Sequence, residues 1–166
     1  RAVLTQPVST PVSIPVLVAA QVARTPAAVA ISFEGRSMTY REVDEAANRL
    51  AHLLTGQGGG RGQCVALLLS RSAEAVVAML AVLKTGAAYL AIDPALPDAR
   101  IGFMLTDAAP TAAVTSTGLA ARLDGYEVAV IEVDDPAIAT QPATALPAPA
   151  PDDIAYLTYT SGTTGT

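Results

Sequence analysis

The chain has 166 residues, of which 51% are hydrophobic, and its formal net charge is −5. This length provides one domain with a substantial core and is too short for two large domains. The negative charge argues against a nucleic-acid-binding surface. A single cysteine, Cys64, excludes an internal disulfide and a thiolate zinc cluster. Because it starts an apolar run, we expect it to pack as a small hydrophobic side chain.

The longest uninterrupted apolar stretch, residues 75–83, is far too short to cross a bilayer. The N-terminal residues do not show the basic-then-apolar pattern of a secretion signal. We therefore expect a soluble, cytoplasmic protein without a membrane partner. The richness in alanine, and the use of arginine with Lys84 as the only lysine, suggest a bacterial genome of high GC content.

The N-terminal part of the chain predicts a linker, a helix and a hairpin, in that order. Residues 1–15 contain three prolines and predict an extended linker from an upstream segment, because proline cannot donate a backbone hydrogen bond. A short helix is expected over residues 16–24, since the following proline, Pro26, disfavours its continuation. Residues 28–33 and 36–39 flank the pair Glu34-Gly35 and predict a small β-hairpin.

A longer helix is expected to follow Thr39. Thr39 and Glu42 have the spacing of a capping box, which satisfies free amide groups at a helix start. Apolar side chains then recur at steps of three and four residues and predict one buried face: Tyr40, Val43, Ala47, Leu50 and Leu54. Glu45 and Arg49 are expected to pair on the solvent side. His52, the only histidine, is expected to be solvated rather than a catalytic base or a metal ligand.

Strands and helices are expected to alternate through the rest of the chain. The expected strands are residues 64–69, 87–92, 112–115 and 128–133, and the expected helices are residues 72–85, a segment starting near 97, and 119–123. In the helix near residue 97, Ile101, Met104 and Leu105 should face inward. This alternation predicts an α/β fold with a parallel sheet flanked by helices. Residues 134–151, with five prolines, predict a surface connection that is either held by its neighbours or mobile.

Several residues of functional type are predicted to be structural. The glycine-rich residues 56–62 follow a helix and precede a strand, which is the reverse of a dinucleotide-binding loop, so they predict a turn. Asp93 and Pro94 end a strand where ligands often bind, but a turn that positions the next helix is favoured. The pair at residues 152–153 predicts a solvated turn. No spacing of acidic residues or histidine predicts a metal site.

The last residues carry the strongest functional signal. Residues 154–159 predict a short strand that leads into a loop of small polar residues: Thr160, Ser161, Gly162, Thr163, Thr164 and Gly165. Glycines let backbone amides approach an anion, and the hydroxyls add donors with little bulk. The spacing is not that of a Walker loop. The string by itself is also typical of a flexible turn.

Three segments together resemble a known family. The string YTSGTTG resembles the phosphate-binding loop of adenylate-forming enzymes. Residues 38–54 (MTYREVDEAANRLAHLL) and 83–108 (LKTGAAYLAIDPALPDARIGFMLTDA) are similar to core motifs of the amino-acid-adenylating domains of non-ribosomal peptide synthetases. The resemblance covers about residues 14–166. The chain departs from the pattern at Ala91, where the family usually has proline, and it stops before the Pro-Lys-Gly that follows the loop.

The resemblance implies that residues 16–166 are the N-terminal portion of an adenylation domain and have the fold of adenylate-forming enzymes. Such a domain activates an amino acid with ATP and Mg²⁺, and passes the aminoacyl group to the 4′-phosphopantetheine of a carrier domain. Carrier and condensation domains of the same synthetase are therefore the expected partners. The loop from Thr160 to Gly165 would bind the ATP phosphates.

The resemblance also implies that the catalytic lysine, the metal-binding acid and the amino-acid pocket lie beyond Thr166. No catalytic residue or metal ligand is therefore assigned to this chain, which is expected to be inactive by itself. Two alternatives stay open from the sequence. One is a fragment of an aryl-acid, fatty-acyl or coenzyme A ligase, and the other is a non-catalytic α/β scaffold whose Ser/Thr/Gly tail is a simple turn.

Overall fold

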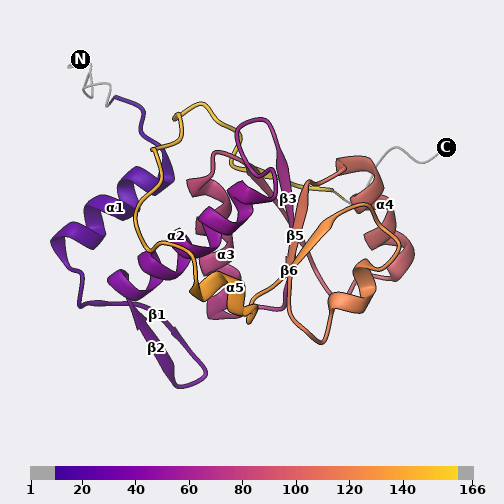
Figure 1. Cartoon of the computed structure of the whole chain (residues 1–166), viewed down its shortest axis with the longest axis horizontal. Helices are drawn as coiled ribbons and strands as arrows, with labels where there is room; N and C mark the ends of the chain where they lie inside the picture. Colours follow the sequence, from indigo (N-terminus) through magenta and orange to yellow (C-terminus); the bar gives the residue numbers. More distant parts are fainter. Residues whose placement is uncertain (1–9, 161–166) are drawn as a thin grey trace, which may run out of the picture.

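The computed structural model describes residues 10–160, and five parallel strands form its central sheet (Figure 1). In chain order these strands are β3 (Cys64–Leu68), β4 (Ala88–Ile92), β5 (Ala112–Thr115), β6 (Ala129–Glu132) and β7 (Tyr156–Leu157). Their order across the sheet is β6-β5-β3-β4-β7. The central strands are short apolar runs buried on both sides, as is usual in parallel sheets. The predicted α/β fold is confirmed.

Helices cover both faces of the sheet (Figure 1). One face packs against α2 (Tyr40–Gly56) and α3 (Ala73–Lys84), and the other against α4 (Asp98–Ala108) and the 3₁₀ helix η1 (Ala120–Leu123). Successive side chains of a strand point to opposite faces. Val65 and Leu67 accordingly belong to the first core, whereas Ala66 and Leu68 belong to the second. None of the helices within residues 10–160 is long and apolar enough to span a bilayer.

The N-terminal elements differ only slightly from the prediction. Helix α1 (Ile14–Arg24) begins two residues earlier than expected. Its second residue is Pro15, which is tolerated in a first turn because the amide hydrogen there has no partner within the helix. The hairpin of β1 (Val29–Phe33) and β2 (Arg36–Thr39) is confirmed. Its turn places Gly35 at φ 77°, in the left-handed region that glycine adopts readily.

The capping box at the start of α2 is confirmed. The Thr39 hydroxyl accepts a hydrogen bond from the Glu42 amide at 3.2 Å, and the Thr39 amide donates to the Glu42 carboxylate at 2.7 Å. These bonds to Thr39 lower the pKa of Glu42. Four of the five predicted apolar positions are buried, and Tyr40 is half-buried. The local pattern therefore predicted both the start and the buried face of this helix.

The polar side of α2 holds residues 134–151, which we call the connection. Figure 1 shows this segment running beside α2, with the short helix α5 (Pro136–Ala139) within it. Asn48 donates to the Ala143 carbonyl at 2.9 Å, and His52 Nε2 lies 2.9 Å from the Thr144 carbonyl oxygen. The sequence left open whether the connection is held by its neighbours or mobile, and these contacts show that its neighbours hold it. His52 lies on the polar side of α2, as predicted, and is partly exposed there, but the sequence did not predict its contact with the connection.

The predicted pair of Glu45 and Arg49 was wrong. Within residues 10–160, no ion pair joins these two side chains. Arg49 instead donates to the carbonyls of Ala139 and Gln141, at 3.1 and 2.6 Å. Because the connection lies over this side of α2, Arg49 satisfies backbone carbonyls there rather than a neighbouring side chain.

One ion pair joins α2 to α3. Lys84, expected in the last turn of its helix, has a side chain only 7% exposed, and its ammonium group lies 2.8 Å from Asp44 Oδ1. The other oxygen of Asp44 accepts from Asn48 at 3.3 Å. A buried ion pair of this kind gives little net stability, but the loss of one partner leaves a charge without compensation.

We therefore expect Lys84→Ala to lower the free energy of unfolding by about 3 kcal/mol, because Asp44 keeps its charge in a largely enclosed position. Urea unfolding followed by circular dichroism measures this effect. The control is Glu45→Ala, which changes the exposed residue next to Asp44 on α2 and should change the free energy of unfolding by less than about 0.5 kcal/mol. Equal stability of the two variants would contradict this account.

Candidate functional site

The carboxyl ends of parallel strands meet at one edge of a sheet, where open α/β sheets bind their ligands. At this edge, near the ends of β4 and β7, the structure has a cleft of about 790 Å³. Its lining comes from α3, β4, the loop after β4, α4 and the segment around β7: Met79, Tyr89, Ala91, Asp93, Leu96, Arg100, Met104, Tyr156, Leu157, Thr158 and Tyr159. We call it the carboxyl-edge cleft.

The first residue of the predicted phosphate loop lies beside this cleft. Thr160 is exposed, three residues after the end of β7. Its carbonyl oxygen accepts a hydrogen bond from Arg100 Nη2 at 3.4 Å. The other predicted loop residues lie outside the described part of the chain: Ser161, Gly162, Thr163, Thr164 and Gly165. Their contact with phosphate stays a prediction.

Arg100 of α4 lies against two aromatic rings. The centre of its guanidinium group lies 5.4 Å from the ring centroid of Phe103 and 5.8 Å from that of Tyr159. The two rings meet edge to face, with their centroids 6.0 Å apart. Such contacts attract a cation to the ring faces. They place a permanent positive charge where the chain leaves β7 for the predicted loop.

Tyr159 is tied to α4 by a second contact. Its hydroxyl donates to Asp107 Oδ2 at 2.5 Å. Loss of solvation on burial, followed by the hydrogen bond and the negative charge of Asp107, raises the pKa of Tyr159 to about 12. At neutral pH the side chain is therefore a neutral phenol that donates a hydrogen bond. It anchors the segment after β7 and does not act as a base.

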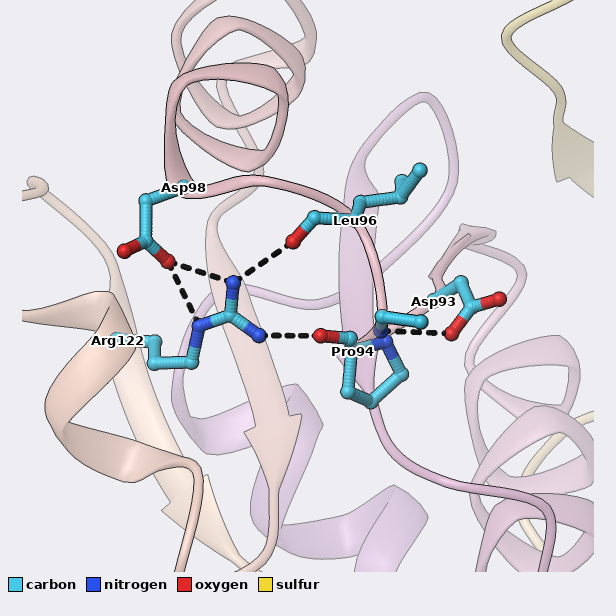
Figure 2. A network of polar contacts seen from close by, with 6 residues as sticks. Asp93, Pro94, Leu96, Asp98 and Arg122 are labelled. Atoms are coloured by element: carbon cyan, nitrogen blue, oxygen red, sulfur yellow. Dashed lines mark hydrogen bonds and ion pairs between the residues drawn. The ribbon is translucent and has the colours of Figure 1, made fainter.

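Arg122 of η1 holds the loop between β4 and α4, which lines the cleft. Figure 2 shows its guanidinium group reaching the Pro94 and Leu96 carbonyls and the carboxylate of Asp98. The bonds to Asp98 Oδ1 are 2.8 Å from Nε and 2.6 Å from Nη2. The planar fork of arginine makes several bonds at once in a fixed geometry. One side chain thus fixes the carbonyls of a loop without regular secondary structure.

Asp93 forms a turn, as predicted. Its Oδ1 accepts from the Ala95 amide at 2.8 Å, which closes a tight turn at the end of β4 (Figure 2). Aspartate commonly bonds to the backbone two residues on in this way. Among the described residues that line the carboxyl-edge cleft, Asp93 and Arg100 carry formal charges. The carboxylate is directed to its own backbone, whereas the guanidinium group faces Thr160.

The remaining candidates are structural. The glycine-rich residues 56–62 form the predicted turn between α2 and β3, with Gly58 and Gly62 at positive φ. Cys64 is half-buried in the second core, and burial raises the pKa of its thiol, so it is not an activated nucleophile. Within residues 10–160, no three side chains of His, Cys, Asp or Glu are grouped so that they could hold a metal ion.

The sequence did not point to Arg100, Asp107 or Arg122. Arg100 and Asp107 are seven positions apart on α4 and so share one side of the helix. This spacing could have indicated that both contact the same segment, but it does not identify that segment as the one after β7. Arg122 carries no local signal, because its partners lie 24 to 28 residues earlier in the chain.

Comparison with known proteins gives one family. The family described as AMP-binding enzyme matches residues 18–166. The isonitrile lipopeptide synthase of Mycobacterium tuberculosis is 62% identical over 99% of this chain, and surfactin synthase subunit 2 of Bacillus subtilis is 43% identical over 87%. The chain spans only 6% and 4% of the length of these two relatives.

Solved structures agree with this result. The AMPPNP-bound form of the non-ribosomal peptide synthetase FmoA3 is similar with a TM-score of 0.86 and 32% identity, over 94% of this chain and 17% of that chain. The N-terminal subdomain of NpsA from Klebsiella oxytoca, in complex with 3-hydroxybenzoyl-AMSN, has a TM-score of 0.82 and 27% identity, over 97% and 41%. An artificially fused adenylation-PCP di-domain, NpsA-ThdA from the same organism, has a TM-score of 0.83 and 27% identity, over 93% and 29%.

The contact between Tyr159 and Asp107 can be tested by titration. We expect the Tyr159 phenol to ionise near pH 12, and its pKa to fall in Asp107→Asn, because the substitution removes the negative charge that disfavours phenolate. The raised pKa means that the folded state is favoured as long as the phenol is neutral. This contribution to the free energy of unfolding is complete below about pH 10 and is lost as the pH rises toward the pKa of the folded state. NMR of ring-labelled tyrosine measures the pKa, with Tyr159→Phe to assign the signal. An unchanged pKa in Asp107→Asn would contradict the contact.

Proposed function

The chain belongs to the AMP-binding enzyme family, as the N-terminal part of a non-ribosomal peptide synthetase adenylation domain, and we propose that this domain activates an amino acid with ATP. The products would be an aminoacyl-adenylate and pyrophosphate. The observation that carries the proposal is the position of Thr160. This residue follows β7 and lies beside the carboxyl-edge cleft, next to Arg100. A scaffold without catalytic function, one of the alternatives from the sequence, has no support from the relatives.

In the proposed reaction, a carboxylate oxygen of the amino acid attacks the α-phosphorus of ATP. The bond between this phosphorus and the oxygen bridging it to the β-phosphorus breaks, and pyrophosphate leaves with the electron pair. The protein must hold the phosphates and stabilise the charge that develops on the leaving group. Thr160, Ser161, Gly162, Thr163, Thr164 and Gly165 would do so with hydroxyl and amide donors.

The described residues suit the nucleotide phosphates better than a metal ion. Arg100 provides a cation beside the start of the loop, and the Thr160 hydroxyl is exposed there. The one carboxylate among the described lining residues, Asp93, is bonded to a backbone amide. Magnesium would therefore bind through ATP and through residues outside the described part of the chain. We assign no step of the reaction to a metal ligand here.

We further propose a carrier domain as the acceptor of the acyl group, through its phosphopantetheine thiol. The adenylation-PCP fusion among the solved relatives supports this pairing. Condensation domains of the same synthetase are proposed as partners on the basis of the curated relatives, which are peptide and lipopeptide synthases. The part of residues 1–15 that precedes α1 would then be a linker from an upstream domain, which stays a prediction.

A second candidate substrate is an aryl acid. NpsA, whose N-terminal subdomain is similar to this chain, was solved with 3-hydroxybenzoyl-AMSN. The higher identity to surfactin and lipopeptide synthases favours an amino acid. Both substrates undergo the same adenylation step, so they differ in which acid supports the reaction rather than in the role of the loop.

The direct test is exchange of labelled pyrophosphate into ATP by the intact synthetase. Since adenylation is reversible, we expect exchange that depends on one or a few amino acids. A panel of the proteinogenic amino acids with benzoate, 3-hydroxybenzoate and a medium-chain fatty acid separates the candidates. Exchange supported only by an aryl or fatty acid would overturn amino-acid activation, and exchange with none of the acids would overturn adenylation itself.

The loop is tested by replacing Thr163 and Thr164 together with alanine, which removes two hydroxyls and keeps both glycines. Hydrogen bonds to charged groups contribute about 1.5–3 kcal/mol each, so we expect turnover at saturating ATP to fall tenfold or more if they strengthen in the transition state. A higher Michaelis constant for ATP with unchanged turnover would mean that they act in ground-state binding.

Thr106→Ala, an exposed threonine of α4, is the matched control and should leave both kinetic parameters unchanged. Wild-type kinetics in the double variant would show that the Ser/Thr/Gly loop is a structural turn.

A further inference from the structure

An enclosed carboxylate lies just before β7. The sequence predicted a solvated turn at residues 152–153, and for Asp152 this is correct, since its side chain is 79% exposed. The side chain of Asp153 is only 10% exposed. A carboxylate is costly to remove from water unless it is hydrogen-bonded or paired. Its partners therefore show what this position is built to hold.

Asp153 joins three segments that are distant in sequence. Its Oδ1 lies 2.7 Å from Arg61 Nε, in the glycine-rich turn that precedes β3. Its Oδ2 accepts from the Ala150 amide at 3.0 Å, and its own amide donates to the Ala150 carbonyl at 3.2 Å. These reciprocal bonds close the turn that ends the connection. One side chain thus ties the end of the connection to the turn before the central strand.

The third segment is the end of α3. Gly86 follows this helix at φ 82° and lies near the carboxylate. A Cβ at Gly86 would be 3.5 Å from Asp153 Oδ2 and 3.6 Å from the Arg61 amide nitrogen. The glycine adopts the left-handed backbone that ends α3, whereas the contact that a Cβ would make with the carboxylate is an ordinary one. Asp153 therefore lies next to the end of α3, just before β4 begins.

Strand β7 needs such a fixed point. It pairs with β4 through two residues, Tyr156 beside Tyr89 and Leu157 beside Leu90, with one further bond from the Tyr89 amide to the Ala155 carbonyl at 3.1 Å. So short a strand is weakly specified by its own pairing. A slip of one residue would exchange the faces of its side chains, turning Leu157 out of the second core.

We propose that Asp153 is a positioning residue for the adenylation reaction, because its bonds to Arg61 and Ala150 set the register of β7 against β4 and so hold Thr160 beside the carboxyl-edge cleft. Asp153 lies three residues before β7 and Thr160 three residues after it, so a change in the register of β7 displaces Thr160. The proposal rests on the proposed function, since it concerns where the phosphate-binding residues stand.

The test uses the intact synthetase and compares Asp153→Ala with Asp152→Ala, a control in the adjacent exposed position, where the carboxylate makes only an exposed contact with Arg61 at 3.8 Å. We expect the Michaelis constant for ATP to rise roughly tenfold in Asp153→Ala. This is the size of effect expected when the displaced loop loses a hydrogen bond to a charged phosphate of ATP. The Michaelis constant for the amino acid should stay unchanged. A defect in stability alone would lower turnover through the active fraction and would leave both Michaelis constants as they are.

Two further variants grade the effect and remain informative if Asp153→Ala does not fold. Asp153→Asn keeps an acceptor for the Ala150 amide and should restore much of the ATP affinity. Arg61→Ala removes the ion pair with Asp153, together with the 3.8 Å contact to Asp152, and leaves the bond to Ala150. It should raise the Michaelis constant for ATP by a few-fold, since exposed ion pairs contribute modestly. ATP Michaelis constants equal to wild type in Asp153→Ala, or in both Asp153→Asn and Arg61→Ala if the alanine variant does not fold, would overturn the proposal.

Direct binding of a fluorescent ATP analogue separates this outcome from failure of the proposed function. If the wild-type synthetase binds the analogue but shows no amino-acid-dependent exchange, amino-acid activation is wrong. The positioning role of Asp153 is then decided by the dissociation constant of the analogue. A dissociation constant weakened in Asp153→Ala and unchanged in Asp152→Ala supports the role, and equal values in all three proteins refute it.

Discussion

The pairing of β7 with β4 is the contact on which the candidate site depends, since it brings the last described residues of the chain to the sheet edge where ligands bind. This pairing comprises two residue pairs. The stacked rings of Tyr89 and Tyr156, with centroids 5.7 Å apart, add an aromatic contact across it. Beyond β7, Tyr159 is bonded to Asp107 of α4. The strand is thus held by side chains before, within and after it rather than by a long ladder of backbone bonds.

The connection reaches β7 only after crossing the polar side of α2, and this crossing explains much of the polar chemistry of the chain. Its five prolines and irregular backbone leave carbonyls that no sheet or helix satisfies. Asn48, Arg49 and His52 each supply a side-chain nitrogen to one or more of these carbonyls. Helix α2 therefore buries its apolar side in the core and uses its polar side to order the connection.

The sequence predicted the features that depend on residues close together in the chain. It did not predict contacts between residues that are distant in the chain. The capping box, the buried face of α2 and the strand-helix alternation are local patterns, and the structure confirms them. Arg49, His52 and Asp153 were predicted as surface groups because their own helix or turn is polar. Their partners lie about 90 residues away, or in an unrelated turn. Only packing of the whole chain brings those groups together, so periodicity and propensity could not reveal them.

The same limit applies to the site. The resemblance of the final strand and loop identified the family, whereas the side chains that hold that strand had no motif of their own. Arg100 shows why they matter: the two rings beside it restrict its position, and the carbonyl of Thr160 accepts one of its hydrogens. Tyr159 stays neutral, and the carboxylate of Asp93 is occupied by its own backbone. Beside Thr160, the described part of the cleft therefore presents the positive charge of Arg100, which suits the triphosphate of the proposed substrate.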